Sequence, residues 1–288
     1  MIAFLGMGLL GSNFVRAMIS KGETVRVWNR TTSKAAELEK YGAKAFANAT
    51  EAVKDADVIH LTLKDDGTVN EVLEMVRAGL KPGATIIDHT TTSVGGAIQR
   101  TAEWKEKGFT YLHAPVFMGP ANALESTGFM LVSGDQAVIG KHSPALSKMT
   151  GKLMNFGPET GRAAGMKLLG NNFLVAFTAG LADTLSLAKA LQIPAADITT
   201  LFDSWNPAAT LSGRLKKMTG GDYSNPSWEL NMARKDVGLF LDAAKKAGTN
   251  LVVIPAIAGE MDRYIAKGHG NEDWTVIAKD AAANSPAS

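Results

Sequence analysis

Short apolar runs alternate with amphipathic stretches from the N-terminus to residue 115. Runs rich in β-branched residues predict strands at residues 2–5, 25–28, 58–62, 85–88 and 110–113. Apolar residues at helical spacing predict helices between them, at 10–20, 33–41, 68–78 and 96–107. Gly22, Gly42 and Gly108 follow three of these helices, and glycine is favoured at helix C-termini. Strands that alternate with helices are typical of a parallel sheet covered by helices.

After Gly161 the strand pattern disappears and helical spacing takes over. Just before this point, residues 128–133 and 153–156 predict two more strands with a helix between them. Beyond it, helices are predicted at 163–191, 195–204, 228–247 and 255–266. We therefore predict an α/β doubly wound sheet in residues 1–161, followed by an all-helical domain in residues 162–288 that begins with a long interdomain helix. A chain of 288 residues has the length at which single domains usually divide.

Two apolar segments resemble targeting or membrane signals. The run 166–191 has the length of a membrane span, but it contains Lys167, Asn171, Asp183 and Lys189, so we expect a buried helix instead. The opening MIAFLGMGLLGSNFV lacks the basic region of a signal peptide, and its glycines suit a strand and a turn. We expect a cytoplasmic protein with no membrane partner.

Charge and composition exclude several classes of partner and chemistry. Lys and Arg number 30 against 28 Asp and Glu, so the chain has no general field that would attract nucleic acid. It contains no cysteine, which excludes disulfides, thiolate catalysis and cysteine-bound zinc. The histidines are scattered without a pair at ligand spacing, so no metal site is predicted; they are His60, His89, His113, His142 and His269.

Three glycines follow the first predicted strand in the pattern Gly6-x-Gly8-x-x-Gly11. Such a pattern is a weak signal alone, but here a strand precedes it, a helix follows, and a second strand ends at Asn29. The first glycine allows a tight turn, the second lets backbone amides approach a pyrophosphate, and the third allows close packing of the helix. The sequence therefore predicts a Rossmann-type dinucleotide-binding domain in residues 1–161.

Arg30 stands where an acidic residue would bind the adenosine ribose of NAD. Thr31 and Lys34 follow it closely. An arginine with hydroxyl donors suits the 2′-phosphate of NADP better than a neutral ribose, so we predict NADP(H) as the cofactor. The alternative is an exposed arginine beside a helix cap.

Lys167 and Asn171 lie four residues apart near the start of the predicted long helix, which places both on one face. A solvated lysine and a packed asparagine would be the ordinary interpretation. The apolar neighbours favour another, because a partly buried ammonium group is a tunable acid or base.

Five motifs in order resemble those of the β-hydroxyacid dehydrogenase family, which includes 3-hydroxyisobutyrate dehydrogenases and glyoxylate/succinic semialdehyde reductases. They cover nearly the whole chain: FLGMGLLGSNF at the glycine turn, DHTTTS from residue 88, HAPVFMGP from 113, GRAAGMKLLGNN from 161 and ARKDVGLFLDAAKKAG from 233.

The resemblance implies roles for particular residues. Lys167 would be the catalytic acid or base, Asn171 would help to hold the substrate, and Thr91 would lie near nicotinamide and substrate. Lys235 and Asp236 would close the site from the helical domain. The predicted cofactor-binding residues are Gly6, Met7, Gly8, Leu9, Leu10, Gly11, Asn29, Arg30, Thr31, Lys34, Thr62, Leu63, Thr91, Lys235 and Asp236.

The segment Phe117-Met118-Gly119 departs from the family pattern. Family members commonly have Ser-Gly-Gly here, a turn that offers a hydroxyl and amides to a substrate carboxylate. Two bulky apolar side chains suggest a less polar substrate, so Phe117, Met118 and Gly119 join Thr91 and Lys235 as predicted substrate-binding residues. The alternative is that Phe117 and Met118 are buried core residues outside the pocket.

The resulting prediction is an NADP-dependent oxidoreductase that transfers hydride between nicotinamide and a small β-hydroxyacid or semialdehyde. We expect a homodimer or higher homo-oligomer formed through the helical domain. Two alternatives stay open. Imine reductases share the glycine turn and a similar WNRT segment, although Lys167 favours the dehydrogenases. A non-catalytic NADP-binding module would tend to lose the lysine that this chain keeps.

Overall fold

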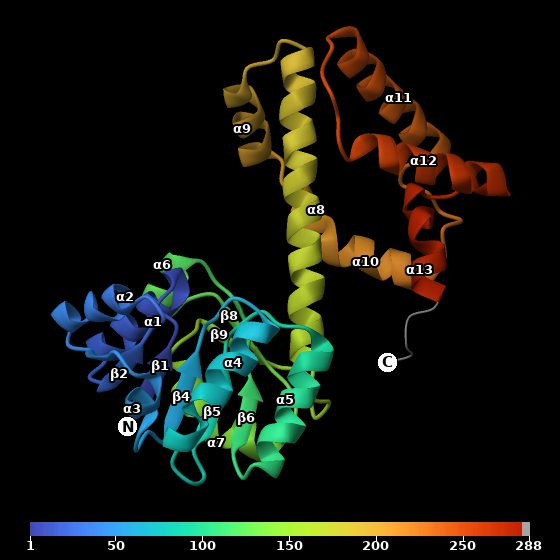
Figure 1. Cartoon of the computed structure of the whole chain (residues 1–288). Helices are drawn as coiled ribbons and strands as arrows, with labels where there is room; N and C mark the ends of the chain where they lie inside the picture. The colour runs from blue at the N-terminus through green and yellow to red at the C-terminus, as the bar shows by residue number, and fades with distance from the viewer. Residues whose placement is uncertain (284–288) are drawn as a thin grey trace. The chain divides into compact units, whose positions relative to one another are not determined.

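The computed structural model describes residues 1–283, which form two units, Met1–Asn172 and a second that begins at Phe173. In the first unit (Figure 1), six parallel strands form a sheet in the order β3-β2-β1-β4-β5-β6. The strands are β1 (Ile2–Leu5), β2 (Val25–Trp28), β3 (Lys44–Phe46), β4 (Val58–Leu61), β5 (Thr85–Asp88) and β6 (Thr110–His113). The order reverses between β1 and β4, and this reversal creates the crevice in which such sheets bind ligands.

Helices cover both faces of this sheet. Side chains from α1, α6 and α7 join one apolar cluster, and side chains from α3, α4 and α5 join the other. The bounds of these helices are α1 Leu9–Ser20, α2 Thr32–Ala36, α3 Ala49–Val53, α4 Asp66–Val76, α5 Val94–Glu106, α6 Pro120–Glu125 and α7 Gln136–Ser147. Short 3₁₀ helices lie at Glu39–Tyr41 and Arg77–Gly79.

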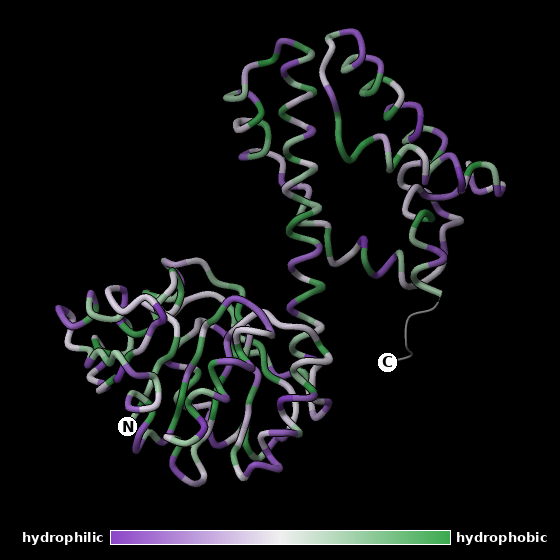
Figure 2. The backbone as a smooth tube through the Cα atoms, viewed as in Figure 1, coloured by the Kyte–Doolittle hydropathy of each residue, from purple (hydrophilic) through white to green (hydrophobic). Residues whose placement is uncertain are grey.

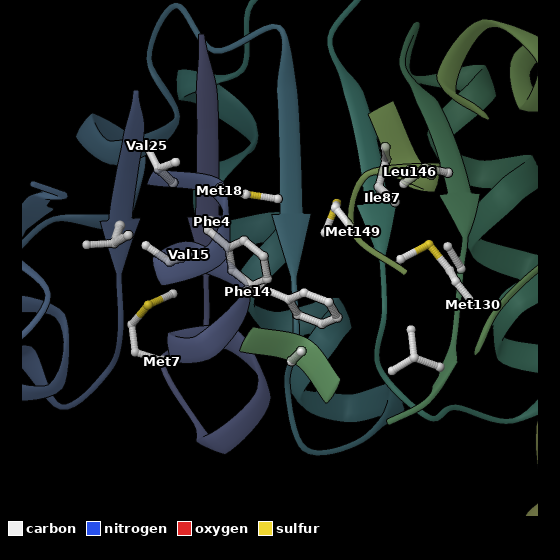
Figure 3. Packing of buried hydrophobic residues seen from close by; sticks show 14 of the residues in the cluster. Phe4, Met7, Phe14, Val15, Met18, Val25, Ile87, Met130, Leu146 and Met149 are labelled. Carbon is white, nitrogen blue, oxygen red and sulfur yellow. The ribbon is translucent and has the colours of Figure 1, made fainter. Parts of the chain in front are cut away.

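Alternating side chains of β1 supply the two clusters. Phe4 points to the α1 face, while Ala3 and Leu5 point to the other. Figure 3 shows Phe4 and Phe14 packed within the first cluster, where their rings lie 6.1 Å apart. This packing fixes α1 on β1 and so positions the glycine turn that joins them.

A second, three-stranded sheet has the order β7-β8-β9, with β7 at Val116–Phe117, β8 at Phe129–Val132 and β9 at Lys152–Asn155. It contains the two strands predicted at 128–133 and 153–156. All five earlier strand predictions are confirmed within one residue. The glycine caps are confirmed as well, with φ of 87° at Gly22, 102° at Gly42 and 83° at Gly108.

The regular elements in the described part of the second unit, up to residue 283, are helices, apart from an isolated bridge between Glu229 and Asp273. The long helix α8 (Arg162–Ala190) enters it from the first unit, and the helices that follow are α9 Ala195–Ser204, α10 Leu211–Gly220, α11 Leu230–Lys246, α12 Ile254–Tyr264 and α13 Lys279–Ala283. 3₁₀ helices lie at Pro207–Thr210 and Trp274–Ala278, and a π-helical turn at Ile265–His269. The core of the second unit joins α11, α12 and the 3₁₀ helix Trp274–Ala278. Its buried residues include Leu230, Val237, Met261, Tyr264 and Val276.

The prediction that the run 166–191 is a buried helix is wrong for the part of the chain that the structure describes. About half of the residues of α8 are exposed and few are buried; the exposed ones include Phe173, Leu174 and Val175. Figure 2 shows apolar residues along this helix, which is long and apolar enough to cross a membrane; one such helix is weak evidence of a span. Its apolar residues point in several directions, and the packing within one chain covers few of them.

Candidate active site

The glycine turn between β1 and α1 is built by two close approaches of backbone. Gly6 has a φ of 97°, and a Cβ atom there would lie 2.2 Å from the carbonyl oxygen of Thr62. A Cβ atom at Gly11 would lie 1.9 Å from the carbonyl oxygen of Gly6. The fold itself therefore requires glycine at both positions.

Gly8 differs, because a Cβ atom there would meet nothing within 4 Å. Gly8 is the N-cap of α1. The first turn of α1 holds no acidic residue, and no side chain caps the start of this helix. The start of α1 therefore carries no capping side chain and has free space beside Gly8, as an anionic ligand such as a pyrophosphate requires. Beside them the Met7 amide donates to Asn29 Oδ1 at 2.9 Å, which fixes the end of β2 against the turn.

Arg30 and Thr31 follow β2, and Lys34 lies in α2; all three line a cavity of about 320 Å³ together with Gly6 and Gly8. Both cations are exposed, and neither forms an ion pair with the residues that the structure describes. Thr62, Leu63 and Lys64 line the same cavity from the end of β4, and Glu71 of α4 is the acidic side chain at its wall. This is the crevice beside the strand-order reversal. The predicted cofactor residues that line it are Gly6, Gly8, Asn29, Arg30, Thr31, Lys34, Thr62 and Leu63. Of the remaining ones, Met7 is buried under the turn, whereas Leu9 is 77% exposed at the start of α1 and Leu10 is half-buried.

Thr91 is the exposed residue of an otherwise buried turn after β5. Asp88 Oδ1 accepts from the Thr90 amide at 2.8 Å, and Thr90 Oγ1 accepts from the Leu63 amide at 2.9 Å. Thr92 is buried with its Oγ1 3.2 Å from His113 Nε2. The turn is thus held on both sides of Thr91, which is itself exposed.

A buried polar network anchors this turn, and the sequence pattern did not reveal it. The Tyr111 hydroxyl donates to Asp88 Oδ2 at 2.6 Å and accepts from Arg100 Nε at 2.9 Å. Arg100, only 2% exposed, also donates to Asp66 Oδ1 at 2.8 Å. Burial raises the pKa of Tyr111 far above its ordinary value, so it remains a hydroxyl donor. The signal was faint, because Asp88 and Arg100 resemble ordinary surface residues of a strand end and a helix.

Lys167 and Asn171 face each other across one turn of α8. Lys167 Nζ donates to Asn171 Oδ1 at 3.0 Å, and Lys167 is 8% exposed. Burial lowers its pKa below the ordinary value for lysine, and no carboxylate among the described residues forms an ion pair with it. Such an ammonium group releases its proton at a lower pH than a solvated one, which suits a group that must exist in both protonation states.

The three residues Phe117, Met118 and Gly119 have different surroundings in the structure. The Phe117 ring lies under Lys167, with Nζ 4.2 Å from its centroid. Met118 packs against the apolar cluster on the α1 face. The Gly119 amide donates to Asn122 Oδ1 at 2.9 Å, so it is already engaged within the chain.

Lys235 and Asp236 lie on α11 of the second unit, where Lys235 Nζ is 3.0 Å from Asp236 Oδ1. Their role at the cofactor stays a prediction.

Two histidines that are far apart in the sequence lie side by side in the structure: His60 Nδ1 lies 2.9 Å from His89 Nε2 in the sheet core. Burial lowers the pKa of both, to about 4 for His89, so the pair is neutral near pH 7. Within residues 1–283 no group of three or more His, Asp or Glu side chains is placed to hold a metal.

Comparison with known protein families gives two matches. Residues 1–157 match the NAD binding domain of 6-phosphogluconate dehydrogenase, and residues 159–283 match the C-terminal domain of NADPH-dependent reductive aminase-like proteins. The 3-sulfolactaldehyde reductase of Escherichia coli is 30% identical over 96% of this chain and 94% of its own. A probable 3-hydroxyisobutyrate dehydrogenase of Mycobacterium tuberculosis is 26% identical over 96% of both chains.

Two solved structures show the same fold. The imine reductase of Myxococcus stipitatus, in complex with NADP⁺, has a TM-score of 0.90 at 22% identity over 96% of this chain and 98% of its own. The reductive aminase of Aspergillus terreus, in complex with NADPH, cyclohexanone and allyl amine, has a TM-score of 0.87 at 21% identity over 97% and 98%. The family match over residues 1–157 and the relative at 30% identity show that the chain belongs to the hydroxyacid dehydrogenase family of pyridine-nucleotide-dependent oxidoreductases.

Proposed function

We propose that this protein is an NADP-dependent oxidoreductase acting on a small β-hydroxyacid or semialdehyde, with Lys167 as its acid and base. The observation that carries the proposal is the buried Lys167 ammonium group hydrogen-bonded to Asn171 at 3.0 Å without a carboxylate partner among the described residues. A structural lysine buried to this degree is ordinarily paired with a carboxylate.

A bound nicotinamide supplies the hydride. Lys167 performs the proton transfer: in reduction its ammonium group donates a proton to the substrate oxygen as negative charge develops there, and in oxidation the neutral amine accepts the proton back. Asn171 accepts one Lys167 N–H, which orients the group along the helix face. Desolvation strengthens the interaction between the ammonium and the developing alkoxide.

The preference for NADP rests on the charges at the end of β2. Arg30 and Lys34 are exposed, line the same cavity and have no ion-pair partner among the described residues. A 2′-phosphate would supply the missing anion through charge-assisted hydrogen bonds. The NADP⁺ in the imine reductase structure and the NADPH in the reductive aminase structure support the same choice.

A second candidate function is the reduction of cyclic imines. Two observations favour it: the C-terminal domain matches reductive aminase-like proteins, and the aromatic ring of Phe117 lies beside Lys167. Steady-state assays with NADPH decide between the two, using succinic semialdehyde, 3-hydroxyisobutyrate with NADP⁺, and a five-membered cyclic imine. Higher kcat/KM for the imine than for both acids would replace the primary proposal with the second. NADPH binding without turnover of any substrate would favour a non-catalytic module.

The proposal includes a homodimer formed through the helical domain. Leu174 and Val175 are 57% and 70% exposed, and neighbouring α8 residues Phe173 and Phe177 stack at 6.2 Å on the surface. Exposed apolar side chains of this kind are stabilised by contact with a second apolar surface, and a second copy of α8 provides one. Light scattering on the purified protein should give twice the mass of one chain. Val175→Asp should shift the mass toward one chain, whereas a single-chain mass for the unaltered protein would reject the dimer.

A further inference from the structure

The Phe117 ring occupies the space on one side of the Lys167 ammonium group. Lys167 Nζ lies 4.2 Å from the ring centroid, within the range of a cation–π contact. Its hydrogen bond to Asn171 uses a separate direction. A substrate that approached Nζ from the side of the ring would have to displace the ring first.

Two structural features hold the ring in place. Its backbone belongs to β7, where Phe117 pairs with Phe129 and the preceding Val116 is buried. Its tip rests on Gly170 of α8, where an added Cβ atom would lie 2.3 Å from Phe117 Cζ and 2.8 Å from Cε1. Gly170 is half-buried and lies within α8, so no turn requires a glycine there. The contact with the Phe117 ring explains why this position lacks a side chain.

We propose that Phe117, seated on Gly170, is a specificity-determining residue: it selects substrates whose reacting carbonyl carbon carries a methylene or larger apolar group and disfavours a carboxylate bonded directly to that carbon. This inference rests on the proposed function of Lys167. It refines the substrate class, because semialdehydes have a methylene group at that position, whereas α-oxo acids have the carboxylate there.

The physical reason is the environment that the ring creates at Nζ. A carboxylate on the reacting carbon would come close to the ring and lose water there, and the Gly119 amide, already bonded to Asn122, does not offer it a donor. The negatively polarised face of the ring is also unfavourable to an anion. An apolar substituent gains contact with the same ring.

The test compares kcat/KM for propanal and glyoxylate, which are similar in size and differ in the group on the carbonyl carbon. The variants are Phe117→Ala, Gly170→Ala and the double variant. Gly165→Ala is the matched control, because it lies in the same helix and its new Cβ would meet Val94 at an ordinary 3.7 Å. NADPH titration of each variant confirms that the protein is folded.

Both single variants should lower the propanal-to-glyoxylate ratio, by on the order of tenfold for Phe117→Ala. The double variant should match Phe117→Ala, since the new methyl group at position 170 then has no ring to displace. Gly165→Ala should keep the ratio of the unaltered protein. An unchanged ratio in NADPH-binding Phe117→Ala would overturn the inference, and so would an unchanged ratio in Gly170→Ala.

A second readout does not depend on turnover. In the cofactor-free protein, the ring should shift the NMR signals of the Lys167 ε-methylene protons upfield, because they lie near an aromatic face. This shift should vanish in Phe117→Ala and diminish in Gly170→Ala. Its absence in the unaltered protein would contradict the seating of the ring. Failure of the unaltered protein to reduce either aldehyde, with the NMR shift present, would count against the proposed function of Lys167 instead.

Discussion

The Lys167 ammonium nitrogen lies 3.0 Å from the side-chain oxygen of Asn171, one helical turn further along α8. This pair forms at the start of a helix whose first turns belong to the sheet-bearing unit. The acid group and the cofactor crevice are therefore carried by the same unit, while Lys235 and Asp236 are carried by the other.

The cofactor preference is tested at Arg30. Arg30→Ala should weaken NADP binding far more than NAD binding, by about 1.5–3 kcal/mol, because it removes a charge-assisted contact to the 2′-phosphate. Fluorescence titration with both cofactors measures this. Arg77→Ala is the control, since Arg77 is an exposed arginine paired with Glu74 at 2.9 Å. Equal losses for NADP and NAD would reject the assignment.

The rate of reduction should fall at alkaline pH. Burial lowers the pKa of Lys167, and reduction requires the ammonium form, so activity is full below this pKa and is lost as pH rises through it. Oxidation requires the neutral amine and should rise through the same value. pH profiles of kcat in both directions test this. Lys167→Arg should abolish the oxidation limb, because guanidinium keeps its proton; profiles without a common inflection below the ordinary lysine pKa would contradict it.

Asp183 stabilises the start of α12 in the second unit. Its carboxylate accepts from the amides of Val252, Val253 and Ile254 at 2.7, 2.8 and 3.0 Å. Asp183→Ala should therefore raise the hydrogen-exchange rates of these amides. The free energy of opening that these rates report should fall by about 1–3 kcal/mol. Asp242→Asn, an exposed change on α11, should leave them unchanged. Equal rates in Asp183→Ala and the unaltered protein would exclude this role.

The Asp183 contribution should also depend on pH. Burial raises the pKa of Asp183, but the hydrogen bonds from Val252, Ile254 and Val253 outweigh this, and the net shift is downward. A carboxyl group with a lowered folded-state pKa stabilises the fold above its unfolded value and loses that contribution as pH falls through the folded one. The exchange difference between Asp183→Ala and the unaltered protein should therefore shrink in acid. A difference that persists unchanged would point to packing instead of charge.

Phe117 and Met118 should have separable effects, since the ring contacts Lys167 and Met118 packs on the core. Phe117→Ser should raise kcat/KM for glyoxylate relative to cyclic imines and uncharged aldehydes. Met118→Gly should lower stability by about 1–3 kcal/mol through lost packing and added backbone freedom. Chemical unfolding and substrate ratios measure the two effects. A changed ratio in folded Met118→Gly would place Met118 in the pocket.

Local patterns predicted much of the fold. The strand-turn-helix around Gly6 was predictable because its spacing, glycines and periodicity lie within a few residues. β3 was missed because Lys44–Phe46 is too short and too exposed to show a strand pattern. α10 was missed because its sequence, LSGRLKKMTG, combines glycines with few apolar positions.

Contacts between distant segments were not predictable from one sequence. Nothing near Phe117 indicates that its ring rests on Gly170, and nothing near Asp88 indicates its bond to Tyr111. The exposure of α8 could not be predicted for a related reason. The sequence of an apolar helix has the same pattern whether its own chain or a second copy covers it. The contact between Lys167 and Asn171 could be predicted from the sequence because it depends only on helical spacing.

The role of Lys167 as proton donor is tested by single-turnover reduction of the best carbonyl substrate by Lys167→Ala loaded with NADPH. The rate of NADPH oxidation should fall by about 10²–10⁴-fold, as is typical when a general acid is removed, while NADPH affinity is retained. Asn171→Ala should reduce the rate less, because the proton donor remains. A Lys167→Ala variant that reduces the substrate at nearly the unaltered rate would exclude Lys167 as the acid.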